Sequence, residues 1–248
     1  NGGGASGARL QLALLSNLGA ELEHFKTKII ENTSEYETLL TFQPVDISAA
    51  CNRGRSDEAP NDETGGWIDL GQTDLRMLPT GPQYLNNGVL FDIVDEQANH
   101  NKGCVMLAPS PKHPGAPPAT RKLILESEPI NVERHADYLF FLHTAAYDAE
   151  AACNPVMAYE IRYEGFKDLI PGMDYTEFVA KVPVQTKVHI QDWITGPKGP
   201  VIPYAWKGRT GAGEGKLDCH LYSMKWRNPK PNKKIESIRV VSTNAQCI

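Results

Sequence analysis

The acidic residues of one loop-like stretch are the first candidates for chemistry. Residues 51–83 are dense in Asp, Glu, Gly and Pro, and four carboxylates fall close together there: Asp57, Glu58, Asp62 and Glu63. Ca²⁺ is held by about six to eight oxygens, which a turn can supply, and we take Asp57 and Asp62 as its candidate ligands. The run lacks the regular spacing of an EF-hand loop, so a solvated acidic loop is the alternative.

Three tryptophans suggest a second kind of site, a platform for sugars. The apolar face of a sugar ring stacks on an exposed aromatic ring, while neighbouring Asp, Asn and Arg side chains bind its hydroxyls. The candidate rings are Trp67, in the long irregular segment, and Trp193 and Trp206, which flank the Gly- and Pro-containing loop 195–203, with Asp192 and Arg209 as polar partners. Packing is the competing interpretation for each ring, because Trp is mostly buried in proteins.

Motifs for other chemistry are weaker. The glycine-rich stretch 208–216 fails the spacing of a phosphate-binding loop, so we interpret it as a hairpin or rim loop. His143, His189 and His220 lie on predicted strands and could converge on a metal ion, with ordinary packing as the alternative. Neither HExxH nor GxSxG occurs. Carboxylates are numerous, so a paired-acid glycosidase site stays open until their separation in space is known.

Length, charge and cysteine count narrow the class of protein. A chain of 248 residues makes one large domain, or one domain with an appendage. The net charge of −5 and the lack of a basic tract argue against a nucleic-acid partner, and no apolar run is long enough for a membrane span. Five cysteines without zinc spacing leave both disulfides and free thiols open. The start at Asn1 indicates a processed or excised piece, or an engineered start.

Hydrophobic periodicity predicts one helix followed by strands. An apolar stripe over 8–31 predicts an amphipathic helix, which packs on the next domain or serves in docking or oligomerisation. We therefore divide the chain into a helical segment with a linker, 1–38, and a second domain, 39–248. Short runs typical of strands follow at 41–47, 89–94, 136–145, 158–163, 179–184 and 188–194.

The stretch 216–241 predicts a terminal hairpin. Leu217, Cys219 and Leu221 alternate with His220, Tyr222, Met224 and Trp226, which predicts a strand covered on both faces, with Trp226 structural. The segment 228–232 contains two prolines and is the predicted turn. Many short strands and a single long helix predict an all-β fold, an antiparallel β-sandwich of jelly-roll type with one N-terminal amphipathic helix.

Several phrases of the sequence together resemble one family. They are Phe42-Gln-Pro-Val-Asp-Ile47, Cys51-Asn-Arg-Gly54, Gly65-Gly-Trp-Ile-Asp69, Asp74-Leu-Arg76, Pro79-Thr-Gly81, residues 136–145, Ala205-Trp-Lys-Gly208 and residues 226–235. Over about residues 40–248 the chain resembles the jelly-roll, carbohydrate-binding-like modules appended to bacterial glycoside hydrolases and other large extracellular proteins. The resemblance implies a β-sandwich, a secreted or cell-surface location and a further strand after Ile248 that is cut off or supplied from elsewhere.

We therefore expect a non-catalytic, extracellular module that binds a polysaccharide or glycan, with Ca²⁺ as the one cofactor that the residues suggest. A parent glycosidase chain or a second copy of the chain is a further expected partner. Two other functions stay open. One is a structural subunit of an extracellular polymer, assembled through the N-terminal helix or a donated strand. The other is a glycoside hydrolase or lyase.

Overall fold

The computed structural model describes residues 42–63, 66–108, 124–146, 155–168, 174–195, 199–211 and 216–242. The chain divides into two units, Asn1–Phe42 and Gln43–Ile248, and nearly all of the described residues belong to the second. The predicted helix over 8–31 lies outside the described residues. Within the described part of the chain, no helix has the length and apolar character needed to cross a membrane.

The described residues are almost entirely β-structure and irregular loops, which confirms the predicted all-β class. Two 3-10 helices occur among them, η1 (Ser48–Ala50) and η3 (Phe166–Asp168). The strands are β1 (Gly81–Tyr84), β2 (Leu90–Ile93), β3 (Ile130–Arg134), β4 (Tyr138–His143), β5 (Met157–Tyr163), β6 (Val179–Val184), β7 (Trp206–Arg209), β8 (Asp218–Arg227) and β9 (Ile235–Ser242).

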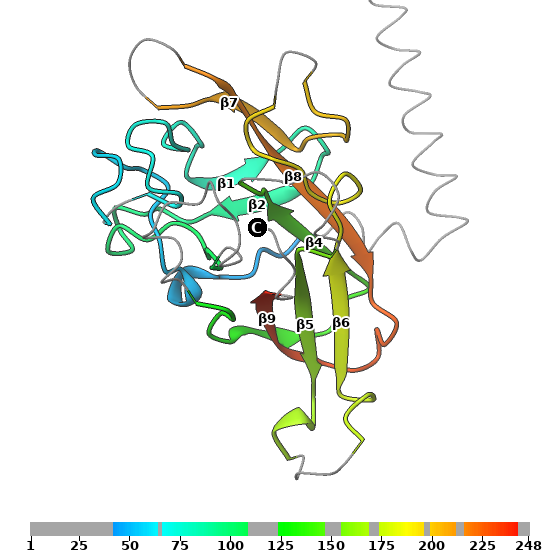
Figure 1. Ribbon diagram of the computed structural model, residues 1–248. Coiled ribbons are helices and arrows are strands. Elements are labelled where there is room, and N and C mark those ends of the chain that lie inside the picture. Colours follow the sequence, from blue (N-terminus) through cyan, green and yellow to red (C-terminus); the bar gives the residue numbers. More distant parts are fainter. Residues whose placement is uncertain are drawn as a thin grey trace, which may run out of the picture. The chain divides into compact units, whose positions relative to one another are not determined.

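The strands form three antiparallel sheets (Figure 1). The largest has the order β3-β9-β5-β6, the second has the order β4-β8-β7, and β1 and β2 pair as a separate ribbon. All pairings between these strands are antiparallel, as the short turns predicted.

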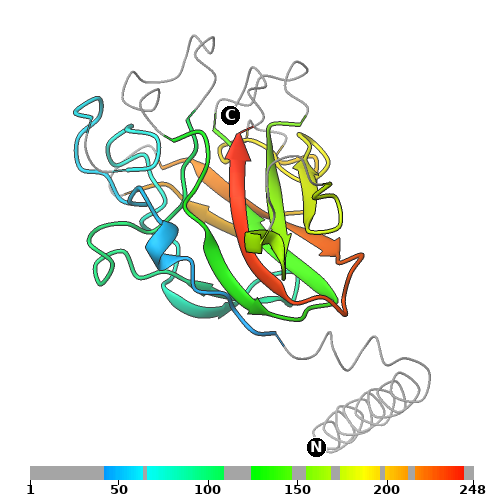
Figure 2. The same ribbon diagram turned by 90° about the horizontal axis from the view of Figure 1, so that it is seen from below.

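One hydrophobic core joins the two larger sheets. Its side chains come from β3, β5, β6 and β9 of one sheet and from β4 and β8 of the other. Phe141 of β4 stacks on Tyr159 of β5, with ring centroids 3.8 Å apart and an interplanar angle of 13°. Figure 2 shows β9 (red) and β5 passing in front of the orange β8. Burial of these apolar faces supplies the main force that holds the sheets together.

A second core lies on the opposite face of β8. Cys219 and Leu221 are buried there against Trp67, Trp193 and other residues of the long segments before β1 and before β7. Met224 of the same strand belongs to the first core. The alternation predicted for β8 is therefore confirmed: both of its faces are covered, and the second face is covered by loops.

The prediction that the last two strands pair with each other as a hairpin is wrong. β8 pairs with β4 and β7, whereas β9 pairs with β3 and β5, so the connection 228–234 passes from one sheet to the other. Buried Asn228 fastens this connection: its Nδ2 donates to Ala136 O at 2.7 Å, and its Oδ1 accepts from Tyr163 Oη at 2.6 Å. Sequence alternation identifies a strand but not the sheet that receives it.

Two other predicted strands are absent from the described residues. The segment 42–47 forms no ladder and leads into η1, where Ser48 N donates to Asp46 Oδ1 at 2.8 Å. The segment 188–194 makes isolated bridges only, at Ile190, Asp192 and Ile194. Three strands that the sequence analysis did not predict are present instead, namely β1, β3 and β7.

Candidate functional site

The predicted acidic loop folds back on itself between η1 and β1. An antiparallel bridge pairs Pro60 with Leu70, and Asn61 N donates to Asp69 O at 3.2 Å. Asp57 fastens the base of the loop, because its Oδ2 accepts from Gly71 N at 2.8 Å and its Oδ1 accepts from Ala59 N at 3.2 Å. The local chain reversal thus brings carboxylates from both arms of the loop together.

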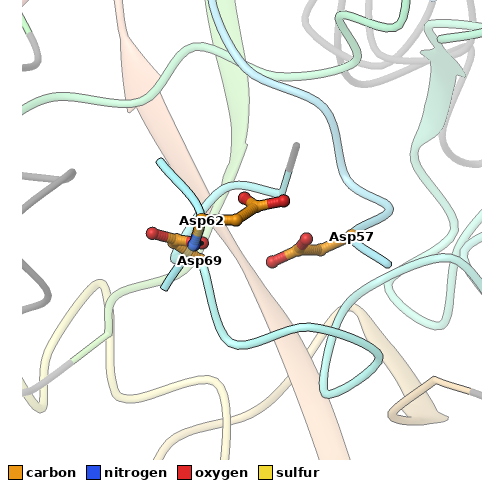
Figure 3. A group of neighbouring side chains, drawn as sticks. All are labelled: Asp57, Asp62 and Asp69. Carbon is orange, nitrogen blue, oxygen red and sulfur yellow. Dashed lines mark hydrogen bonds between the residues drawn. The ribbon is translucent and has the colours of Figure 1, made fainter. Parts of the chain in front are cut away.

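Three carboxylates converge inside this loop (Figure 3). One oxygen each of Asp57, Asp62 and Asp69 lies within 4.8 Å of the others; Asp57 and Asp69 are buried and Asp62 is exposed. Burial raises the pKa of Asp57, and the neighbouring charges of Asp69 and Asp62 raise it further against two backbone hydrogen bonds that lower it. A divalent cation bound through these oxygens, or a proton on Asp57, would relieve the repulsion. The structure thus places predicted Asp57 and Asp62 together and adds Asp69.

The other acidic residues of the segment have cationic or backbone partners. Arg76 forms an ion pair with buried Asp74 (Nη2 to Oδ2, 2.8 Å) and with exposed Glu58 (Nη1 to Oε1, 3.1 Å). Hydrogen bonding to Asp74 raises the pKa of Arg76. Glu63 donates its backbone N–H to Asp69 Oδ2 at 3.3 Å. Glu58 therefore pairs with Arg76, whereas Glu63 contacts the three aspartates through its backbone N–H.

An open polar depression of about 950 Å³ lies beside this loop. Its wall contains four cationic side chains (Arg53, Arg55, Arg76, Lys102), five carboxylates (Asp57, Glu58, Asp62, Asp95, Glu96) and no Phe, Tyr or Trp. Buried Arg55 holds its wall together by donating to Leu78 O at 2.9 Å and to Val94 O at 3.0 Å. The depression can hydrogen-bond a polar ligand, but it offers no ring on which a sugar could stack.

Two of the three tryptophans predicted as sugar platforms are core residues. Trp67 is 4% exposed and Trp193 is 2% exposed. Their rings pack edge to face, with centroids 5.1 Å apart at 80°, inside the second core. The prediction that these rings are exposed is wrong, because the loops that carry them fold over β8 and use the indoles to cover it.

Trp206 lies on the inner face of β7. Its indole is half-buried against the second core and lies over Gly208, where any Cβ would collide with the ring. Trp226 is half-buried against the first core, as the alternation predicted. None of the four indoles therefore stands out from the surface as a free platform.

The opposite face of β7 and β8 carries an aromatic ring with charged neighbours. Lys207 pairs in register with His220, and Arg209 pairs with Asp218, so these four side chains share one face of the two-stranded ribbon. Lys207 Nζ lies 2.8 Å from Asp218 Oδ2, and Arg209 Nε lies 3.9 Å from Asp218 Oδ1. Hydrogen bonding to Lys207 lowers the pKa of Asp218.

Tyr204 adds the ring to this face. It is 36% exposed, and its centroid lies 5.0 Å from that of His220, which is 2% exposed. His220 Nδ1 has no hydrogen-bond partner among the described residues. Burial lowers the pKa of His220, and Lys207 lowers it further, so the imidazole is neutral at pH 7. We call Tyr204, Lys207, Arg209, Asp218 and His220 the β7–β8 face.

Asp192 and the remaining histidines have structural contacts. Asp192 Oδ1 accepts from Ile194 N at 2.9 Å. Arg209, the other residue predicted to bind sugar hydroxyls, pairs with Asp218. His143 Nδ1 lies 2.9 Å from Tyr159 Oη, and its Nε2 lies 2.9 Å from His189 O. Within the described segments the three histidines do not gather around a common metal position.

Sequence reasoning missed Asp69, Tyr204, Lys207 and Asp218, and it considered His220 only as a metal ligand. Asp69 lies two residues after Trp67, outside the denser acidic run 57–63 from which the candidate metal ligands were chosen. The β7–β8 face was missed because residues 206–209 were not predicted as a strand. A strand there would have put Lys207 and Arg209 on one side and Trp206 on the other.

Comparisons with known proteins give no further identification: no family model, no curated protein and no solved structure matches this chain.

Proposed function

We propose that this chain is a non-catalytic, extracellular glycan-binding module with a jelly-roll-type antiparallel β-sandwich, of the kind appended to larger secreted enzymes. The fold supports the sandwich, because the sheets β3-β9-β5-β6 and β4-β8-β7 contribute to one core. The connection from β8 to β9 passes between sheets, which is typical of jelly rolls.

One observation carries the proposed function: the β7–β8 face presents a solvent-accessible ring beside charged hydrogen-bonding groups. Tyr204 can stack on the apolar face of a sugar, and Lys207, Arg209 and Asp218 supply donors and acceptors for its hydroxyls. The polar depression beside the acidic loop has charged hydrogen-bonding groups but no Phe, Tyr or Trp in its wall. The β7–β8 face is therefore the better sugar site.

The buried carboxylates support a binding role over hydrolysis. Both oxygens of Asp57 accept backbone N–H groups, and both oxygens of Asp69 do the same from Asp62 and Glu63. Carboxylates held in this way stabilise the loop.

A glycan screen with the purified chain tests the proposal. We expect binding to at least one polysaccharide, and we expect Tyr204→Ala to weaken that binding about tenfold, since loss of one stacked ring costs about 1.4 kcal/mol. Affinity would be measured by isothermal titration calorimetry.

Tyr175→Ala is the matched control. Tyr175 is 60% exposed and lies outside β7 and β8, so its loss should leave the affinity unchanged. Equal weakening by both variants, or no binding to any glycan, would overturn the proposal.

A further inference from the structure

We infer that the β7–β8 face selects acidic glycans, which carry carboxylate or sulfate groups, over neutral ones. This inference rests on the proposed function and adds the chemical class of the ligand. The two cations of β7 stand side by side at Lys207 and Arg209, and both are well exposed, with side-chain exposures of 46% and 64%. Side chains two residues apart on a strand point to the same side, so one anionic group can contact both.

The local charge favours an anion. Of the carboxylates in the described segments, Asp218 is the one that pairs with Lys207 and Arg209, and Arg209 Nη2 donates to Lys216 O at 2.7 Å, which places a third cationic residue next to the face. The face is therefore positively charged on a chain whose net charge is −5. The wall of the polar depression has one more carboxylate than cations. With a net charge of −5, the chain as a whole does not attract an acidic polymer, whereas the β7–β8 face does.

Asp218 does not neutralise both cations equally. It lies 2.8 Å from Lys207 Nζ but 3.9 Å from Arg209 Nε. The guanidinium of Arg209 is thus loosely paired and exposed, and a planar guanidinium binds carboxylate or sulfate through two parallel hydrogen bonds. Arg209 is the main anion contact, Lys207 is the second, and Tyr204 receives the sugar ring.

Paired polymers that differ only in charge test the inference. Polygalacturonate is compared with its methyl ester, and dextran sulfate with dextran, by affinity electrophoresis and calorimetry on the full chain. We expect at least tenfold tighter binding to one acidic polymer than to its neutral partner, with affinity falling as salt is raised. The two pairs distinguish a carboxylate ligand from a sulfate ligand.

Two double variants of equal charge change locate the contact. Lys207→Gln with Arg209→Gln should weaken binding of the acidic polymer at least tenfold. Lys181→Gln with Lys233→Gln removes two charges from residues in and beside the other large sheet and should weaken it less than twofold. All four positions are exposed or half-buried, and thermal unfolding of each variant confirms that it is folded.

Each outcome decides a different point. Equal binding of charged and neutral polymers would overturn the acidic-glycan inference and leave the proposed function standing. Equal loss in the two double variants would show non-specific attraction of a polyanion and would also overturn the inference. Failure to bind any glycan in the wider screen would overturn the proposed function itself.

Discussion

At the residue scale, a glycine gives Asp57 its place in the acidic loop. A Cβ added at Gly66 would lie 2.5 Å from Cβ of Asp57, closer than two non-bonded carbon atoms can approach. Asp57 is 3% exposed and accepts hydrogen bonds from both sides of the loop. The convergence of the three aspartates therefore depends on a missing side chain as much as on the acids themselves.

We expect Gly66→Ala to lower the free energy of unfolding by about 1–3 kcal/mol, the usual cost of forcing extra carbon into a packed site. Urea denaturation at pH 7 measures it. Gly88→Ala is the control, since an added Cβ there meets nothing within 4 Å and costs only the strain of its φ of +74°. The same loss in both variants would show that the contact with Asp57 is not the reason.

The sequence predicted the chemistry of these residues better than their surroundings. It identified Asp57 and Asp62 from local density alone, because acids close in sequence stay close in a short loop. It could not tell that Trp67 and Trp193 are buried. Whether an indole is exposed depends on what the tertiary fold places over it, and here each ring covers the other.

At the element scale, the connection between β8 and β9 decides the topology. Asn228 is 3% exposed, and its amide joins the turn before β4, the end of β5 and the start of the connection itself. Its backbone N–H also donates to Asp137 O at 2.8 Å. One side chain thus fastens three segments where the chain leaves one sheet for the other.

Asn228→Ala should lower the free energy of unfolding by about 2–4 kcal/mol. The truncation leaves buried Tyr163 Oη and half-buried Ala136 O without their partner, and a buried group left unpaired costs about 1–3 kcal/mol. Chemical denaturation followed by circular dichroism measures the loss. Asn131→Ala on β3 changes an exposed side chain and should fall within about 0.5 kcal/mol of the wild type. An Asn228→Ala variant with an unchanged free energy of unfolding would contradict the role of this network.

Two sheet edges bear on assembly by strand addition. β6 lies at an edge of the four-stranded sheet and contains Lys181 and Pro183, and both residue types oppose pairing with another strand. β3 lies at the other edge and is interrupted by an irregular register, with Glu133 at a φ of 51°. Strand donation at these two edges is therefore disfavoured by the same features that keep sheet proteins from aggregating.

Strand prediction succeeded where burial follows a simple period and failed where tertiary pairing decides. β6 was predicted with its observed bounds, and β4 and β5 nearly so. β1 and β7 are four residues each, too short to show a period, and contain proline or glycine. The segment 188–194 alternates as a strand does, yet its pairings with the described residues are isolated bridges, one of them from Ile194 to Cys219 of β8.

At the scale of the whole molecule, a polar contact crosses the core between the two large sheets. His143 of β4 is buried and lies 2.9 Å from Tyr159 Oη of β5 and 2.9 Å from His189 O. A carbonyl oxygen only accepts, so Nε2 carries the proton and Nδ1 accepts from the tyrosine hydroxyl. The neutral imidazole satisfies both ring nitrogens in this way, and burial lowers the pKa of His143 to about 4.

This contact makes the stability of the fold sensitive to acid. Between pH 6.5 and about 4 the unfolded chain binds a proton at His143 and the folded chain does not, so the free energy of unfolding falls as the pH falls through that range. The contribution is present above pH 6.5 and is lost in the acidic range. Asp57 acts with the opposite sign, because burial raises its pKa in the folded state above the ordinary value of 3.8.

Burial also lowers the pKa values of His189 and His220, which act with the same sign between pH 7 and pH 5, so a His143 variant is needed to separate the share of His143. Over this interval we expect the wild type to lose about 2 kcal/mol of unfolding free energy through His143, at about 1.4 kcal/mol per pH unit below 6.5. His143→Gln retains an amide donor and an acceptor without titrating in this range, so its stability should depend on pH much less. Urea unfolding at the two pH values measures both. His100→Gln replaces an exposed histidine and should keep the wild-type pH dependence. If His143→Gln keeps the wild-type pH dependence as well, the cross-sheet contact is not the source of the acid sensitivity, and other titrating groups must cause it.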